Sequence, residues 1–211
     1  MRVVLLGPQG AGKGTQAQRI SERTGAKHIS TGDLVRAEIG SGSELGKKIQ
    51  DYNDRGELVP DEIIVEMTKP DLREHESWIL DGFPRNEAQA RALDEALDEL
   101  GLELDKAVAL EAPDDALVER LSGRRQSQAT GRIYHVRYDP PPEDEGEDPG
   151  PFVQRRDDRE EAIRRRLEIY HEQTKPLKGY YAERGILVEI DALQPIPEVT
   201  EDVLRALGED A

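Results

Sequence analysis

The stretch "RVVLLGPQGAGKGTQAQRI", residues 2–20, joins an apolar run to a glycine-rich turn and then to a segment of helical periodicity. Its glycines at 7, 10, 12 and 14 let backbone N–H groups turn inward around an anion, and the following helix adds the positive end of its dipole. Lys13 is placed to reach the terminal phosphates of a nucleotide. The stretch therefore predicts a strand, a phosphate-binding loop and a helix. The usual loop pattern ends in Gly-Lys-Ser/Thr, whereas here Gly14 separates Lys13 from Thr15.

Short apolar runs recur outward from this stretch and alternate with longer segments of helical period. Three of the runs are almost continuously apolar, which is typical of parallel strands covered on both faces. Strands separated by helices predict an α/β fold with a parallel sheet. The expected strands are 2–6, 27–30, 78–81, 106–111 and 186–191, and the expected helices are 13–25, 31–42, 61–75, 86–101 and 113–125. The helix at 61–75 is expected to bury Ile63, Ile64 and Met67 on one stripe.

Residues 131–158 interrupt the alternation, because they are rich in proline, glycine and acidic residues. The first part, "RIYHVRY" at 132–138, predicts a strand, and the remainder favours either an acidic linker or a small surface insertion that moves. The next segment, 159–185, predicts a long helix that kinks or splits at Pro176.

Composition limits the possible partners and cofactors. A formal charge of −16 argues against nucleic acid and against an anionic membrane. The chain has no cysteine, which excludes disulfides and cysteine-ligated zinc, and its four histidines lack metal-ligand spacing. There is no apolar run of about 18 residues and no secretory signal, so we expect a cytoplasmic protein. The acid excess has two interpretations, plain solubility or adaptation of a halophile to high salt.

Several polar residues occupy positions that suit a second ligand or a metal ion. Asp81 ends the strand 78–81, where a carboxylate can hold Mg²⁺ near a nucleoside triphosphate, although turns at strand ends also favour aspartate. Thr31 and Arg36 could hold a second nucleotide, and Thr31 could also be a helix N-cap. Arginine is the side chain best suited to clamp a transferring phosphoryl group, and surface ion pairs are the competing explanation. The candidate arginines are Arg85, Arg120, Arg124, Arg125, Arg132, Arg155, Arg156 and Arg166.

With these pieces in order, the chain resembles the adenylate kinase family over nearly its whole length. The resemblance rests on "GPQGAGKGTQAQRI", "HISTGDLVRAEI", "GELVPDE", "LDGFPRNEAQA", "GRIYHVRYDPP" and "RRDDREEAIRRRLEIYHEQTKPLKGYY", and Gly-Lys-Gly-Thr is the family's own form of the loop. It implies a three-layer fold of the P-loop NTPase type with a five-stranded parallel sheet, and Mg²⁺-dependent transfer between ATP and AMP that yields two ADP. It also implies a core (1–29, 60–122 and 159–211), an AMP-binding helical segment (30–59) and a lid (123–158). We expect a monomer.

The resemblance also implies roles for individual residues. Phosphoryl transfer is expected from Lys13, Arg85, Arg124, Arg155 and Arg166, with Asp81 holding Mg²⁺ through water. ATP is expected at Gly10, Ala11, Gly12, Lys13, Gly14, Thr15, Arg120, Arg124, Ile133, Tyr134 and Gln194. AMP is expected at Thr31, Arg36, Glu57, Leu58, Val59, Gly82, Phe83, Pro84, Arg85, Gln89, Arg155 and Arg166.

The chain departs from the family pattern in its lid and near its C-terminus. Many long-lid relatives bind zinc through four cysteines, whereas here Gln126, Ser127 and the acidic stretch 143–148 occupy that region. No zinc is therefore expected, and either a polar network or a looser lid must replace it. Ala192 replaces a usual glycine, and Gln194 replaces a common lysine.

Two alternatives remain open. One is a sister kinase with another base preference, such as a GTP:AMP phosphotransferase or a UMP/CMP kinase. The other is a P-loop binding or regulatory protein without turnover. Retention of Lys13, Arg85, Arg124, Arg155 and Arg166 together argues against the second alternative.

Overall fold

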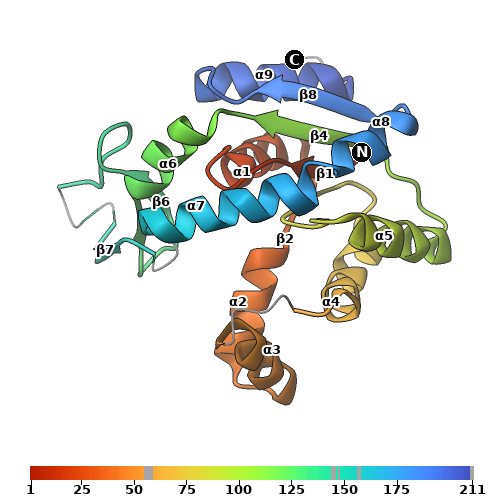
Figure 1. The fold of residues 1–211 in the computed structure, drawn as a ribbon, viewed down its shortest axis with the longest axis horizontal. Helices are drawn as coiled ribbons and strands as arrows, with labels where there is room; N and C mark the ends of the chain where they lie inside the picture. Colours follow the sequence, from red (N-terminus) through yellow and green to blue (C-terminus); the bar gives the residue numbers. More distant parts are fainter. Residues whose placement is uncertain (55–58, 144–145, 147, 156–157, 210–211) are drawn as a thin grey trace.

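A five-stranded parallel sheet forms the centre of the molecule (Figure 1). The computed structural model describes residues 1–54, 59–143, 146, 148–155 and 158–209. The strands run in the order β2-β3-β1-β4-β8, and each of the four neighbouring pairs is parallel. Their bounds are β1 (Arg2–Leu6), β2 (Lys27–Ser30), β3 (Trp78–Asp81), β4 (Lys106–Glu111) and β8 (Leu187–Asp191). The predicted α/β class and five-stranded parallel sheet are confirmed, and the last strand begins one residue later than predicted.

Helices cover both faces of the sheet, which gives three layers. Alternate residues of each buried strand point to opposite faces, so each face has its own apolar cluster. One cluster joins the sheet to α1 (Lys13–Thr24) and α9 (Ile196–Leu207). The other joins it to α4 (Asp61–Glu74), α5 (Glu87–Leu100) and α8 (Leu177–Glu183).

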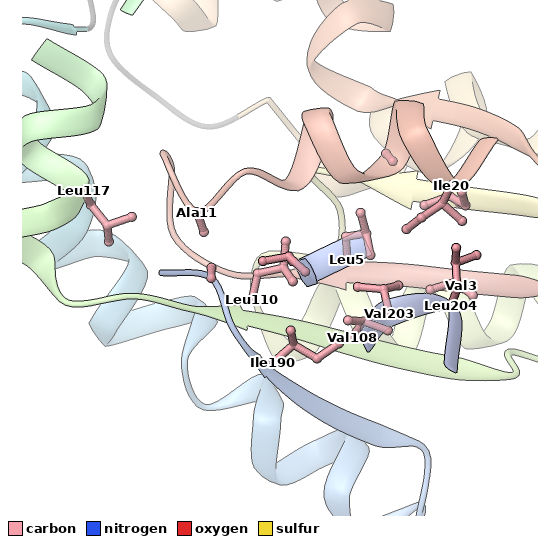
Figure 2. Packing of buried hydrophobic residues seen from close by; sticks show 14 of the residues in the cluster. Val3, Leu5, Ala11, Ile20, Val108, Leu110, Leu117, Ile190, Val203 and Leu204 are labelled. Atoms are coloured by element: carbon pink, nitrogen blue, oxygen red, sulfur yellow. The ribbon is translucent and has the colours of Figure 1, made fainter. Parts of the chain in front are cut away.

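The first cluster extends to the phosphate-binding loop. Figure 2 shows Leu5 of β1 and Leu110 of β4 close to Ala11 of the loop, with Leu117 beyond them. Leu117 belongs to α6 (Asp114–Ser122) and is fully buried. Burying a leucine side chain contributes about 1.5–3 kcal/mol, so the loop is attached to a well-packed part of the core.

Two extensions leave this core (Figure 1). The first is the helical pair α2 (Thr31–Ser41) and α3 (Glu44–Asp54), which projects from the end of β2. The second is a small antiparallel sheet in the order β6-β5-β7, which lies beyond α6. Its strands are β5 (Arg124–Ser127), β6 (Ile133–His135) and β7 (Phe152–Val153). The described residues of 131–158 therefore include two strands of a folded sheet. The strand predicted at 132–138 is shorter because the chain turns back, with the His135 N–H donating to Asp139 O (2.7 Å).

One buried carboxylate organises the interior of the small sheet. Asp148 accepts hydrogen bonds from Ser127 Oγ (2.6 Å), Thr130 Oγ1 (2.7 Å), Tyr134 Oη (3.0 Å) and the Gly150 N–H (3.1 Å). Although burial opposes the charge, these donors lower the pKa of Asp148 to about 2. A network of polar side chains therefore holds together the interior of the small sheet.

The two ends of this extension are joined at its base. The amide of Gln154 donates to the carbonyl oxygens of Ser122 (3.0 Å) and Asp158 (3.0 Å). Ser122 ends α6, and Asp158 precedes α7 (Glu160–Ile169) by two residues. The extension thus leaves and rejoins the core at neighbouring points, between α6 and α7.

The long helix predicted at 159–185 is split, as expected at Pro176. It consists of α7, a π-helical turn η2 (Tyr170–Thr174) and α8, with Pro176 as the N-cap residue of α8. The π-turn brings Thr174 Oγ1 to Arg85 O, to which it donates a hydrogen bond (2.7 Å).

Three details of the helix predictions are wrong. The helix predicted at 113–125 ends at Ser122, because Arg124 and Arg125 belong to β5. On α4 the buried residues are Ile64, Val65, Thr68 and Leu72, while Ile63 and Met67 are only half-buried. Met67 instead lines a narrow gap between α2 and α4. Thr31 is not the N-cap of α2, because Ser30 takes that position and accepts from the Asp33 N–H (3.3 Å).

Candidate active site

The phosphate-binding loop turns between β1 and α1 at the carboxyl edge of the sheet. Gly7, Gly10 and Gly12 have φ angles of 137°, 87° and 92°, a region that other residues rarely adopt. A Cβ on Gly7 would also lie 2.5 Å from Leu110 O. Helix α1 starts without a side-chain cap, so the N–H groups of its first turn are left for a ligand. The loop has the geometry of an anion cradle.

Lys13 lies among other cations at this loop. Its ammonium donates to Gly7 O (2.8 Å) and Pro8 O (3.0 Å). Burial lowers the pKa of Lys13 to about 8; Asp81 opposes the shift, and Arg85, Arg166 and Arg124 add to it. Three predicted arginines are therefore close enough to act on the Lys13 charge. Such a concentration of positive charge favours binding of a polyanion such as a nucleoside triphosphate.

Two arginines, Arg124 on β5 and Arg155 just after β7, form hydrogen bonds with side chains of the protein. Arg124 makes a two-pronged pair with Asp158, through Nε to Oδ2 (2.8 Å) and Nη2 to Oδ1 (2.6 Å). Asp158 is fully buried, and the Arg124 side chain is 19% exposed. Arg155 Nε donates to Gln126 Oε1 (2.8 Å). These contacts restrict the side-chain rotation of both arginines before any ligand arrives.

Asp81 lies at the end of β3, directly beside the strand that leads into the loop. In the sheet register it is opposite Leu5 of β1 and Ser30 of β2. A Cβ on Gly14 would lie 3.5 Å from Asp81 Oδ2, and His28 Nε2 lies 3.8 Å from the same oxygen. Within the described part of the chain, no group of three or more His, Cys, Asp or Glu side chains could hold a metal ion. A single carboxylate beside a phosphate cradle fits Mg²⁺, which usually keeps several waters and few protein ligands.

A second group of predicted residues surrounds the turn that follows β3. Thr31 is 4% exposed, and its hydroxyl donates to Asp81 O (3.2 Å). Gly82 has a φ of 88°, and a Cβ there would come within 2.8 Å of the Thr31 hydroxyl. Arg85 Nε donates to Gly82 O (2.7 Å), and desolvation together with Arg166 lowers the pKa of Arg85. Arg36 pairs with Asp33 on the exposed side of α2.

Gln89 connects this turn to α4. It is 4% exposed, and Asn86 Oδ1 accepts from its N–H (2.8 Å) at the N-terminus of α5. Its side-chain Oε1 accepts from the Arg85 N–H (2.7 Å), and its Nε2 donates to Asp61 Oδ1 (2.7 Å). Phe83 and Pro84 are buried in the turn between Gly82 and Arg85. Val59 is half-buried before α4, whereas Glu57, Leu58 and Arg156 lie outside the described residues.

The residues expected around the ATP base lie around α6, the small sheet and the start of α9. Arg120 is half-buried in the last turn of α6, and Ile133 is 40% exposed. The Tyr134 ring is 3% exposed and packs edge-on against Phe152. Tyr134 thus lies in the interior of the small sheet, so a nucleotide would meet its backbone or Ile133 before its ring. Gln194 Nε2 donates to Asp191 O (3.1 Å) and Asp202 Oδ2 (3.1 Å).

A hollow at the surface of the described structure does not coincide with the phosphate cradle. It has a volume of about 500 Å³ and lies at the carboxyl ends of β4 and β8. Glu111, Glu189 and Asp191 line it, so it repels an anionic ligand. Charge and hydrogen-bonding groups, rather than hollow size, therefore locate the candidate site.

Three residues of this site were not singled out from the sequence: Asp61, Asp158 and Thr174. Asp61 reads as an ordinary acidic residue at a helix start, and Asp158 as one of many acids in a charged stretch. Asp61 acquires a role only through Gln89, Asp158 only through Arg124, and Thr174 only through Arg85, all of them distant in sequence. No local pattern carries that signal.

The parallel sheet, the anion cradle and the surrounding arginines define a nucleotide-binding phosphotransferase of the P-loop class. The adenylate kinase family model matches residues 5–186. The chain belongs to the adenylate kinase family. The predicted family, fold and phosphotransferase function are confirmed.

Curated relatives named adenylate kinase cover the chain almost completely. One from Caldicellulosiruptor bescii is 47% identical over 213 residues, 99% of this chain and 99% of the relative. One from Streptomyces avermitilis is 48% identical over 218 residues, 100% of this chain and 99% of the relative. One from Archaeoglobus fulgidus is 44% identical over 208 residues, 96% of each chain.

Across the described residues, no helix is both long enough and apolar enough to span a bilayer.

Proposed function

We propose that the chain transfers the terminal phosphoryl group of ATP to AMP, reversibly and with Mg²⁺, to give two molecules of ADP. The observation that carries the proposal is the gathering of Arg85, Arg124 and Arg166 around the loop lysine. The acceptor is an already ionised phosphate oxygen, so the reaction needs positioning and charge stabilisation rather than a general base. Arginine supplies both through paired N–H donors.

The site divides into a donor side and an acceptor side. On the donor side, residues 10–15 cradle the ATP phosphates, Arg120, Ile133 and Tyr134 flank the base, and the Gln194 backbone contacts it. On the acceptor side, AMP lies among Thr31, Arg36, residues 57–59, residues 82–85 and Gln89. Lys13, Arg85, Arg124, Arg155 and Arg166 clamp the transferring group between the two sides. The partnered states of Arg124 and Arg155 support this division, since both are oriented in advance.

Asp81 is the proposed protein ligand of Mg²⁺, through water. Its position next to the loop supports this assignment. When bound, Mg²⁺ neutralises charge on the phosphate oxygens. Asp81 would hold and orient the waters of the ion. No zinc is proposed.

We propose that residues 30–59 and 123–158 move against a core made of residues 1–29, 60–122 and 159–211. Each moving segment has its own packing, which supports rigid-body motion. Residues 123–158 are called the lid segment below. Closure of the lid segment would exclude water, which otherwise attacks ATP.

The negative net charge of the chain supports the binding of small molecules rather than of nucleic acid or membrane. We propose a cytoplasmic monomer that binds ATP, ADP and AMP, and neither nucleic acid nor membrane. A net charge of −16 disfavours both of these polyanionic surfaces.

A coupled assay with each pairing of ATP or GTP with AMP, GMP, CMP or UMP tests the proposal. We expect turnover with ATP and AMP, at low salt and at molar salt, and its loss in Lys13→Ala purified in the same way. Preference for GTP as donor, or for UMP or CMP as acceptor, would favour a sister kinase. Nucleotide binding without turnover at any salt would favour a binding protein.

A further inference from the structure

We propose that Asp61 is a positioning residue that sets which base the acceptor side takes, because it fixes the orientation of the Gln89 amide. The inference rests on the proposed function, in which Gln89 contacts the acceptor base. Nothing in the sequence pattern distinguishes Asp61 from the neighbouring Glu62 in the first turn of α4.

The amide of Gln89 is held at both ends. Its oxygen accepts from the Arg85 backbone N–H at 2.7 Å, and its nitrogen donates to Asp61 Oδ1 at 2.7 Å. Gln89 lies on α5 and Asp61 on α4, so two core helices fix this one side chain. The residue is 4% exposed, which keeps competing water away.

Hydrogen-bond chemistry excludes the flipped amide. A backbone N–H can only donate and an ionised carboxylate can only accept. A flip would set donor against donor at Arg85 and acceptor against acceptor at Asp61. Each buried mismatch is costly, so one orientation is enforced.

An amide fixed in this way has one N–H and one oxygen lone pair left for a ligand. Adenine offers the matching pair, an amino donor at position 6 beside a ring-nitrogen acceptor, and glutamine reads that pair with two hydrogen bonds. Hypoxanthine and guanine carry an oxygen at position 6, which would face the Gln89 oxygen. A bidentate pair of this kind discriminates by about 10- to 100-fold.

The neighbouring gap between α2 and α4 is lined mostly by apolar side chains and is closed in this structure. One turn after Asp61, Ile64 and then Met67 face Leu34 and Val35 across the narrow gap between α2 and α4. Asp61 therefore lies one helical turn from apolar side chains on α4, surroundings that suit a group reading the edge of a base.

The test compares AMP with IMP, which differs from AMP at position 6 and the adjacent ring nitrogen. The variants are Asp61→Ala, Asp61→Ser and Asp61→Asn, with Glu62→Ala as the matched control for an acid in the same helical turn. We expect Asp61→Ala to lower the AMP:IMP ratio of kcat/KM about tenfold or more, with the KM for ATP unchanged. Asp61→Asn should also lower the ratio, because its side-chain amide can donate as well as accept and so fits either orientation of Gln89. Glu62→Ala should keep all of it.

Asp61→Ser keeps the test decisive if Asp61→Ala fails to fold. Serine is accepted at helix starts, and its hydroxyl both donates and accepts, so it cannot enforce one amide orientation. Equal loss of AMP and IMP turnover in these variants would mean that Asp61 only supports the fold, and would overturn the inference. A wild-type preference for IMP or GMP over AMP would overturn the proposed function as well, so the two failures are distinguishable.

Discussion

The positively charged side chains of the site repel one another in the absence of a ligand, and the effect is clearest in the lowered pKa of Lys13. Burial and three neighbouring arginines hold its pKa near 8, well below the ordinary 10.5. The charged form is thus held in the folded protein at a cost, which a bound polyphosphate would relieve.

The lowered pKa of Lys13 predicts a pH dependence. Between about pH 8 and 10.5 the unfolded chain binds more protons at this residue than the folded one. The penalty from Lys13 is therefore full below pH 8 and fades as the pH rises through 8. The charge needed for phosphate binding fades over the same range. We expect kcat/KM for ATP to fall above about pH 8, and kcat to fall only at higher pH because bound phosphate raises the pKa.

A Lys13→Arg variant provides the control, because guanidinium stays charged throughout this range. Its activity should be lower, but the decline of kcat/KM near pH 8 should disappear. The same decline in both proteins would assign it to another group.

Arg124 should contribute mainly to turnover. Its two-pronged contact with Asp158 requires a planar fork that lysine cannot supply. We expect Arg124→Lys to lower kcat by about 10²- to 10³-fold, with a smaller effect on AMP affinity. Steady-state kinetics with nucleotide titrations measure both, and Arg164→Lys, which affects an exposed pair with Glu160, is the control. A loss of AMP affinity with full turnover would contradict this role.

At the scale of elements, apolar runs were sufficient to predict the core but not its additions. The five strands and most of the helices between them were predicted because buried strands and amphipathic helices have strong patterns. Helix α9 starts among Pro195 and Pro197, which obscured its helical pattern in the sequence. Helix α3 buries only Gly46 and Ile49 among its described residues, so its apolar pattern is weak. Strand β5, "RRQS", has no apolar pattern and exists through its pairing with β6 and β7.

The polar network of the lid segment should hold that segment together as firmly as a bound metal ion would. Removing Asp148 leaves three hydroxyl groups and one N–H without their common acceptor. We expect Asp148→Ala to loosen the lid segment, so that proteolysis there quickens and the KM for ATP rises while the KM for AMP changes little. Glu143→Gln, an exposed acid of the same segment, should have neither effect.

The pH dependence of this network has the same sign as that of Lys13, because both pKa values are lowered, but it lies at acid pH and concerns a stabilising group. The folded pKa of Asp148, about 2, lies below the ordinary 3.8. Its stabilising contribution is therefore complete above about pH 4 and is lost as the pH falls toward 2. Limited proteolysis with pepsin across that interval should show wild type approaching Asp148→Ala. A constant difference between the two proteins would exclude the carboxylate as the cause.

At the scale of the whole molecule, the acidic surface has consequences that no single residue shows. A net charge of −16 repels itself in dilute buffer, and screening shortens the range of that repulsion from about 10 Å at 0.1 M salt to about 3 Å at 1 M. If the surface is adapted to high salt, the melting temperature should rise from dilute to molar KCl. The same series near pH 5, close to the pI of about 4.7, should show a smaller rise. A flat curve at pH 7 would leave plain solubility as the explanation.

The joined base of the lid segment makes that segment a separable module. Gln154 ties Ser122 to Asp158, so the core helices on either side of the lid segment are held close together at its base. A short turn could replace the lid segment and leave the sheet and phosphate cradle intact. Such a shortened protein would still hold ATP but would leave its terminal phosphate open to solvent. It would also lack Arg124 and Arg155, so the transfer that remained would be slow and would pass phosphoryl groups to water rather than to AMP.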